Sequence, residues 1–124
     1  MSAKILVCDD EQEILDITQM ILEDAGFEVT AVIDSLKVEK LIEEQKPDIL
    51  LIDLWMPGMS GDQVIKSLRL NIKINHTPIV VISASRDGKE IALAAGADDF
   101  LEKPYDIDIL IDTVKKNLSK PLSA

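Results

Sequence analysis

Five side chains able to do chemistry each follow a segment that has the character of a buried strand. They are the acid pair Asp9 and Asp10, then Asp53, Ser83 and Lys103. Carboxylates that share one cleft repel each other unless some stay protonated or a cation holds them together. All-oxygen ligands suit Mg2+, and the sequence offers no cysteine and histidine cluster that would favour zinc or copper. If these residues converge, the sequence predicts a magnesium site.

The same set of groups suits the binding of a phosphoryl group. A cation, the Lys103 ammonium and the Ser83 hydroxyl together match what three equatorial phosphoryl oxygens require. The sequence has no serine–histidine or cysteine–histidine pair to act as a hydrolytic nucleophile, and its glycines lack the Walker lysine pattern. The remaining nucleophile is a carboxylate, for which an aspartyl-phosphate is an established intermediate. Taken alone, Asp53 could equally cap a turn, and one acid of the pair could cap a helix.

Alternating strand and helix patterns predict the elements that must position these residues. Strands are predicted over residues 4–8, 28–32, 49–52, 78–82 and 99–102. Helices are predicted over residues 12–25, 60–71, 89–95 and 107–118, with a short helix that Ser35 caps and that runs through residue 42. This alternation implies an α/β fold with a parallel sheet, helices on both faces and right-handed crossovers. All strands then end at one edge, where ligands bind in such sheets.

Composition limits the class of protein. The chain has 124 residues, 47% of them hydrophobic, and a formal net charge of −10, which suits one globular domain over residues 1–124. The negative charge argues against a nucleic-acid surface. No apolar stretch approaches a membrane span, and the start lacks a signal-peptide core. We therefore expect a soluble cytoplasmic protein without direct contact with membranes or nucleic acid. Cys8 is expected in the core without a redox role, and His76 in a surface loop.

Three large apolar side chains need separate predictions. Helical spacing predicts that Ile72 and Ile107 face the core. Trp55, two residues after Asp53, has two interpretations. It could pack on Met56 and Met59 as a local cap, or it could shield the site or meet a partner.

In their order and spacing, these residues resemble the receiver domain of two-component response regulators, the CheY-like family. The resemblance extends from Lys4 to about Leu118. It rests on four motifs, which are Asp9-Asp10, the stretch Ile-Leu-Leu-Ile-Asp-Leu-Trp-Met-Pro-Gly-Met-Ser-Gly around Asp53, Ser83-Ala84, and Gly96-Ala97-Asp98-Asp99-Phe100-Leu101-Glu102-Lys103-Pro104. The family implies a single flavodoxin-like domain with a doubly wound, five-stranded parallel sheet of strand order 2-1-3-4-5. It also implies a cis peptide bond at Lys103-Pro104.

The resemblance also assigns roles at the site. Asp53 would accept a phosphoryl group from a sensor histidine kinase or a histidine phosphotransfer protein. Asp10, Asp53 and the backbone carbonyl of Trp55 would bind Mg2+ directly, with Asp9 contributing partly through water. Lys103 would pair with Asp53 and then with the phosphoryl group.

A second group would transmit the change. Ser83 and Ala84 would follow the phosphoryl group, and Phe100 would turn inward, which would switch a protein-interaction face. The segment between Ser83 and Gly96 is shorter than is usual in the family, which predicts a short or displaced fourth helix. Ile109 lies off the core stripe of the last helix, where it could contact a partner or a second copy. We expect a monomer, with phosphorylation-dependent dimerisation as an option.

Two alternatives compete with this hypothesis. One is a phosphohydrolase that uses an aspartyl-phosphate, like the haloacid dehalogenases, but Trp55 stands where that class has a second aspartate. The other is a receiver-like module that binds proteins without phosphorylation, although all the phosphorylation residues are present. In the favoured hypothesis the protein is not an enzyme, and it promotes only its own phosphorylation and dephosphorylation. The sequence leaves the downstream target open, and also whether the chain acts alone or belongs to a longer protein.

Overall fold

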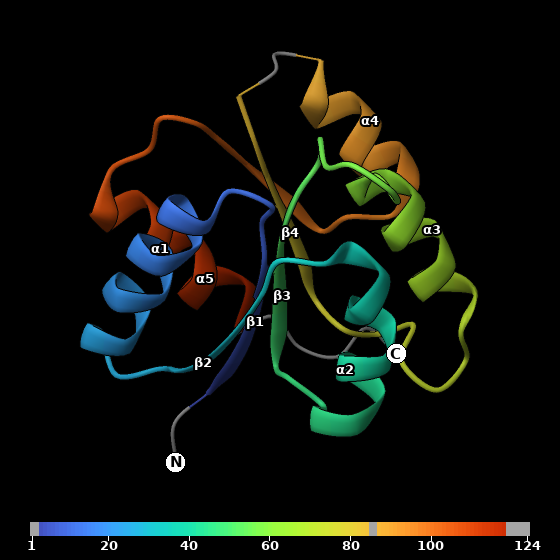
Figure 1. Cartoon of the computed structure of the whole chain (residues 1–124), viewed down its shortest axis with the longest axis horizontal. Coiled ribbons are helices and arrows are strands. Elements are labelled where there is room, and N and C mark those ends of the chain that lie inside the picture. The colour runs from blue at the N-terminus through green and yellow to red at the C-terminus, as the bar shows by residue number, and fades with distance from the viewer. Residues whose placement is uncertain (1–2, 85–86, 119–124) are drawn as a thin grey trace.

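The structure, a computed structural model, describes residues 3–84 and 87–118 and contains a five-stranded parallel sheet between two layers of helices (Figure 1). The strand order is β2-β1-β3-β4-β5. The strands are β1 Lys4–Cys8, β2 Glu28–Val32, β3 Ile49–Asp53, β4 Ile79–Ser83 and β5 Asp99–Glu102. The predicted doubly wound, flavodoxin-like fold and its strand order are thereby confirmed.

The helices divide between the two faces of the sheet. They are α1 Gln12–Asp24, α2 Val38–Gln45, α3 Gly61–Leu70, α4 Gly88–Ala95 and α5 Ile107–Leu118, with a short 3-10 helix at Ser35–Lys37. Figure 1 shows α1 and α5 on one face and α2, α3 and α4 on the other. Two separate apolar clusters fill the two interfaces. Helices α1 to α4 each join two parallel strands, and such a connection packs its helix against one face of the sheet.

Strand β3 shows why the sheet needs helices on both faces. All five of its residues are buried. Leu50 and Ile52 join the cluster under α2, α3 and α4, whereas Ile49 and Leu51 join the cluster under α1 and α5. Successive side chains of a strand point to opposite faces, so a central strand of a covered sheet must be apolar throughout. The strand becomes polar only at Asp53, where it reaches the edge.

Three predictions of local structure are wrong, each at the end of a helix. Ile72 is 86% exposed because α3 ends at Leu70, and Ile74 in the following loop is the buried residue instead. Ile107 is 54% exposed because helical side chains point toward the helix N-terminus, so a side chain in the first turn projects past the helix end. Ser35 does not cap its helix. The Asp34 side chain accepts a hydrogen bond from the backbone N–H of Leu36 instead.

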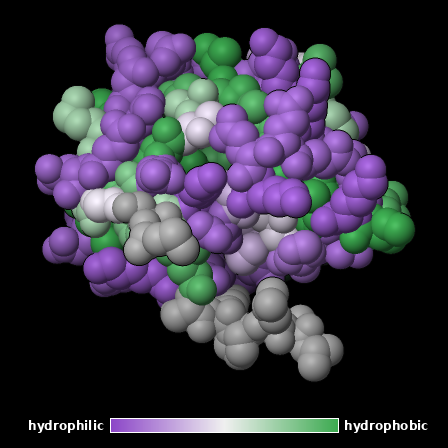
Figure 2. Space-filling model, turned by 90° about the horizontal axis from the view of Figure 1, so that it is seen from below, coloured by the Kyte–Doolittle hydropathy of each residue, from purple (hydrophilic) through white to green (hydrophobic). Residues whose placement is uncertain are grey.

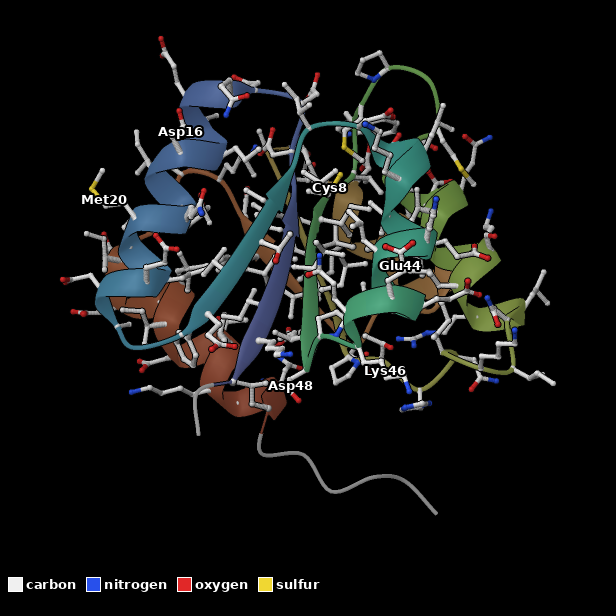
Figure 3. All side chains as sticks on the ribbon, turned by 60° about the horizontal axis from the view of Figure 1, so that its bottom comes forward. Cys8, Asp16, Met20, Glu44, Lys46 and Asp48 are labelled. Carbon is white, nitrogen blue, oxygen red and sulfur yellow. The ribbon has the colours of Figure 1, made fainter. Side chains whose placement is uncertain are left out.

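Other local predictions are confirmed. Cys8 is buried and lies inside the molecule in Figure 3, where Met20 of α1 points outward. His76 is exposed in its loop. Helix α4 has only eight residues and ends at Gly96, which adopts a φ of 115°. The Lys103-Pro104 bond is cis. No helix among the described residues combines the length and apolarity that crossing a bilayer would take.

The strands begin at one edge of the sheet and end at the other, which carries Asp53. Figure 2 shows this beginning edge from below, and hydrophilic residues dominate it. The residues expected to do chemistry lie at the opposite, carboxyl edge.

At the carboxyl edge Gly61, the first residue of α3, donates its N–H to the Leu54 carbonyl at 2.8 Å. The start of α3 therefore rests on the backbone that carries Asp53.

Gly61 should be essential for this close approach. A Cβ at residue 61 would meet the Asp53 carbonyl oxygen and come within 2.8 Å of the Leu54 Cα. Backbone atoms cannot rotate away from a methyl group, so Gly61→Ala should lower the free energy of unfolding by about 3 kcal/mol in urea denaturation. Gly58→Ala is the matched control, because residue 58 has a φ of 80° and open space around it. The control should cost about 1 kcal/mol. An equal or smaller loss for Gly61→Ala would contradict the packing described.

Candidate functional site

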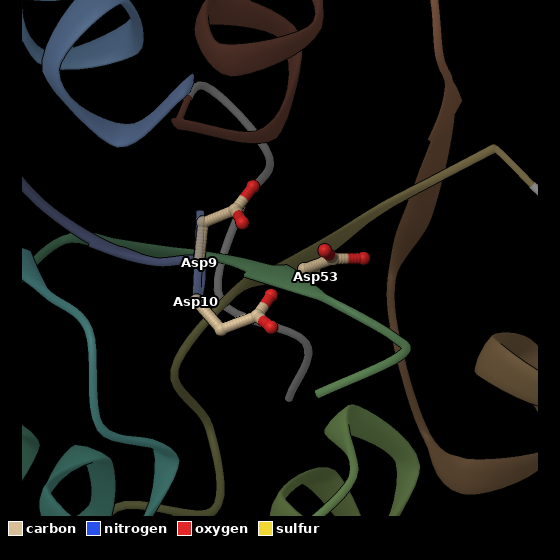
Figure 4. Close-up of side chains that lie close together, drawn as sticks. All are labelled: Asp9, Asp10 and Asp53. Carbon is tan, nitrogen blue, oxygen red and sulfur yellow. The ribbon is translucent and has the colours of Figure 1, made fainter. Parts of the chain in front are cut away.

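The carboxyl edge of the sheet gathers the three predicted acids. Asp9 directly follows β1, and Asp53 is the last residue of β3. The register pairs Cys8 with Ile52, so the residues that follow, Asp9 and Asp53, end up on neighbouring strands. Figure 4 shows the carboxylates of Asp9, Asp10 and Asp53 close together, and an oxygen of each lies within 4.8 Å of the others. The predicted convergence of the acids is therefore present in the fold.

Lys103 brings the one ammonium that contacts this cluster among the described residues. Its Nζ lies 3.1 Å from Asp9 Oδ2 and 3.4 Å from Asp53 Oδ2. All three side chains are largely buried. The resemblance implied a pair with Asp53, and the structure adds Asp9 as a second and closer partner. The other carboxylate oxygens accept backbone N–H groups, Asp9 Oδ1 from Glu11 at 2.9 Å and Asp53 Oδ1 from Trp55 at 3.4 Å.

The carboxylates at this site outnumber the ammonium group that contacts them. Burial and these charges together shift the pKa values of Asp53 and Lys103. Burial raises the pKa of Asp53, the Lys103 ammonium offsets part of this, and Asp9 raises it further. Burial by itself would lower the pKa of Lys103, but the carboxylates of Asp53 and Asp9 outweigh it, so the net shift is upward. The upward shift of Asp53 thus comes first from burial, and that of Lys103 from the two carboxylates that it contacts. The acids are underneutralised, which favours the uptake of a further cation.

The donor set fits a hard divalent cation. Asp9, Asp10 and Asp53 offer only carboxylate oxygens, which are the ligands that Mg2+ prefers. The nearby thiol of Cys8 does not change this, because burial and the surrounding acids raise its pKa to about 12. A protonated, buried thiol is neither a metal ligand nor a nucleophile. This supports the prediction that Cys8 has no redox role.

The predicted switch residues lie at the carboxyl end of β4 and on β5, and they differ in exposure. Ser83 is the fully buried last residue of β4, and its carbonyl accepts the Lys103 N–H at 2.9 Å. Ala84 is exposed, whereas Phe100 is half-buried against the core cluster of α2, α3 and α4. Gly88, which the sequence analysis did not single out, lies close to Ser83 and Phe100. The only sequence signal for it was a glycine at the predicted start of a short helix.

Trp55 lies at the mouth of the site and is 53% exposed. Met56 and Met59 pack against the core cluster of α2, α3 and α4. Trp55 meets Asp53 through its backbone N–H. Its carbonyl as a metal ligand stays a prediction.

Comparison with known proteins agrees with this geometry. Residues 5–115 match the family model of the response regulator receiver domain. A Francisella response regulator receiver domain is 33% identical over 94% of this chain and 97% of its own, with a TM-score of 0.85. The chemotaxis protein CheY4 of Vibrio cholerae is 28% identical over 94% of this chain and 99% of its own, with a TM-score of 0.87.

A third similar structure bears on the fold alone. It is the receiver domain of a sensor histidine kinase from Pseudomonas aeruginosa, solved with a magnesium ion coordinated in its active-site cleft. It is 24% identical over 97% of this chain and all of its own, with a TM-score of 0.90.

The raised pKa of Asp53 leads to a testable difference in stability. Below the unfolded pKa the carboxyl is protonated in both states and carries no penalty, and above the folded pKa it carries the full penalty. Asp53→Asn should therefore raise the free energy of unfolding at pH 7, and the gain should shrink as the pH falls through the acid range. Urea denaturation at a series of pH values measures this.

The control for this experiment is Asp112→Asn, which removes the same charge from an exposed position of α5. It accounts for the change in net charge, and its effect should be small. A gain for Asp53→Asn that matches the control at every pH would show that burial does not disfavour the Asp53 carboxylate.

Proposed function

Because the chain belongs to the family of response regulator receiver domains, we propose that Asp53 is its phosphoacceptor. The protein is a signalling module of two-component systems. The phosphodonor in this proposal is the phosphohistidine of a sensor histidine kinase or a histidine phosphotransfer protein. The observation that carries the proposal is the position of the Asp53 carboxylate, at the carboxyl edge of the sheet with the Lys103 Nζ at 3.4 Å.

The groups around Asp53 suit nucleophilic attack on phosphorus. An Asp53 oxygen forms the new bond to phosphorus, the bond to the donor histidine nitrogen breaks, and that nitrogen keeps the electron pair. Lys103 favours the ionised form of the carboxylate before transfer. It then pairs with the added phosphoryl oxygens, which bring roughly −1.5 to −2 of charge at pH 7. Ser83, at the end of the neighbouring strand, offers a hydroxyl to the same group.

The same acids are proposed to hold Mg2+. Asp10, Asp53 and the Trp55 carbonyl would bind it directly, and Asp9 would contribute partly through water. When bound, the ion supplies positive charge to the acids and to the phosphoryl oxygens. The support for this assignment is the all-oxygen donor set and its excess negative charge.

The output of the proposed switch is the face formed by α4, β5 and α5. Ser83, Ala84 and Phe100 connect the acceptor site to this face. It carries three exposed aliphatic side chains, Leu93, Ile107 and Ile109. Ile107, at the start of α5, was predicted to be buried. We propose that phosphorylation changes the contact of this face with a partner protein or with a second copy of the chain.

The alternative functions gain no support from the described residues. Trp55 occupies the position where a haloacid dehalogenase would have its second aspartate. A module that works without phosphorylation leaves the gathering of three acids and one lysine without a purpose. The proposed activity is therefore limited to the phosphorylation and dephosphorylation of Asp53 itself. We place it in the cytoplasm, the compartment expected from the sequence.

Phosphorylation can be tested with a small phosphodonor. Incubation with acetyl phosphate and Mg2+ should add one phosphoryl group, which alkali removes, as measured by mass spectrometry of the intact protein. Asp53→Asn should abolish the addition, because the amide is not a nucleophile toward phosphorus. Asp112→Asn is the control and should be modified like the wild type. A phosphoryl group that persists at the same level in Asp53→Asn would defeat the assignment.

Binding of Mg2+ can be tested separately through stability. A ligand that binds only the folded state stabilises it by about 1.4 kcal/mol at ten times its dissociation constant. Millimolar Mg2+ should therefore raise the melting temperature of the unmodified protein. Asp10→Ala should weaken this response, and it should stabilise the metal-free protein by removing repulsion from Asp9 and Asp53. Sodium chloride at matched ionic strength controls for screening. A response to Mg2+ no larger than that to sodium chloride would show that the acids do not form a cation site.

A further inference from the structure

Helix α4 begins directly on top of the predicted switch residues. Its first residue, Gly88, is buried. A Cβ at this position would lie 3.1 Å from Phe100 Cε2, 3.2 Å from Ser83 Oγ and 3.3 Å from Leu54 Cδ2. These three atoms belong to side chains of β5, of β4 and of the residue that follows Asp53. The backbone of α4 at residue 88 therefore lies close to both the Ser83 hydroxyl and the Phe100 ring. Any residue other than glycine would place a Cβ between them.

The other end of α4 is held by a different kind of contact. The Gly96 carbonyl accepts a hydrogen bond from Arg69 Nε at 2.8 Å. The Arg69 guanidinium also donates at 2.8 Å to the Thr77 carbonyl and to Asp98 Oδ2. Asp98 Oδ2 in turn accepts the Ile79 N–H at 2.8 Å. Charge-assisted bonds thus tie this end of α4 to α3 and to the start of β4.

The two ends of α4 therefore differ in what can move them. At the C-terminal end, the Arg69 Nε binds the Gly96 carbonyl directly, and the same guanidinium is fixed by its bonds to Thr77 and Asp98. At the N-terminal end Asp87 provides no side-chain cap, so packing against Ser83, Leu54 and Phe100 sets the position of the described first turn. A displacement of Ser83 or Phe100 therefore changes the surface on which the N-terminal end rests.

We infer that Gly88 is the positioning residue through which Ser83 and Phe100 set the position of helix α4. In this arrangement the N-terminal end of α4 shifts, and the end held by Arg69 stays in place. The inference rests on the proposed phosphorylation of Asp53 and adds the residue that carries the change to the exposed face of α4. A methyl group at residue 88 would approach both switch residues more closely than ordinary van der Waals contact, so that the helix or these side chains would have to shift.

A double-mutant cycle tests the contact without phosphorylation. Alanine in place of glycine ordinarily favours a helix, so a fall in melting temperature for Gly88→Ala would mark steric conflict. Phe100→Leu removes the Cε2 atom, and in that background the fall should be at least halved. Lys89→Ala, on the exposed side of the same turn, is the control and should show no coupling to Phe100→Leu. An equal effect of Gly88→Ala in both backgrounds would overturn the inference.

Amide hydrogen exchange with and without beryllofluoride, a phosphoryl mimic, tests the coupling. In the wild type, protection should change most over residues 88–91 and least over residues 96–98. Mass spectrometry after acetyl phosphate treatment should show that Gly88→Ala is modified at Asp53 like the wild type. Its change over residues 88–91 should nevertheless be at least halved.

Each outcome of the second experiment decides a separate point. A wild-type response in Gly88→Ala overturns the positioning role while the proposed function stands. Failure of Gly88→Ala to be modified, with the wild type modified normally, overturns it too, because Gly88 would then act on the acceptor site itself. Failure of the wild type to be modified at Asp53 overturns the proposed function and, with it, this inference.

Discussion

One ammonium facing three carboxylates is the interaction on which the rest of the site depends. The register of β1 and β3 places Asp9 beside Asp53, and Lys103 bridges both from the end of β5. The lysine relieves part of the repulsion and leaves an excess of negative charge. That excess makes the site receptive to a divalent cation. In the proposed function, this lysine, already shared between two acids, would pair with the phosphoryl group without leaving its surroundings.

The cost of gathering these acids is met by the sheet beneath them. β3 and β4 are buried along their full length, and two apolar clusters fix their positions from both faces. Hydrophobic burial on this scale stabilises a domain by far more than one unbalanced charge cluster destabilises it. The strands therefore hold Asp53 at the edge although burial disfavours its ionised form. Gly61 adds a close backbone approach that fixes the chain just beyond Asp53.

The site is connected to the surface of α4 by side chains that share one space. Ser83 is buried at the end of β4, and the Phe100 ring on β5 lies beside the same point of the helix. Gly88 lets the helix backbone reach both of them. Arg69 holds the C-terminal end of α4. A change at Ser83 or Phe100 is therefore expected to move the N-terminal end of the helix. The exposed Leu93 on this helix lies on the face that would display the result.

The sequence by itself determined the strands, their approximate limits and the acids that end them, because apolar runs and helical spacing are local patterns. The resemblance to receiver domains supplied the strand order and the cis bond before Pro104. Tertiary structure alone decided that Lys103 lies closer to Asp9 than to Asp53, since that distance depends on strand register and on how the side chain folds back. It also decided the exposure of Ile72 and Ile107, because a helical pattern does not show where packing ends a helix. The role inferred for Gly88 depends on contacts with Leu54 just after β3, with Ser83 of β4 and with Phe100 of β5, which no local pattern in the sequence records.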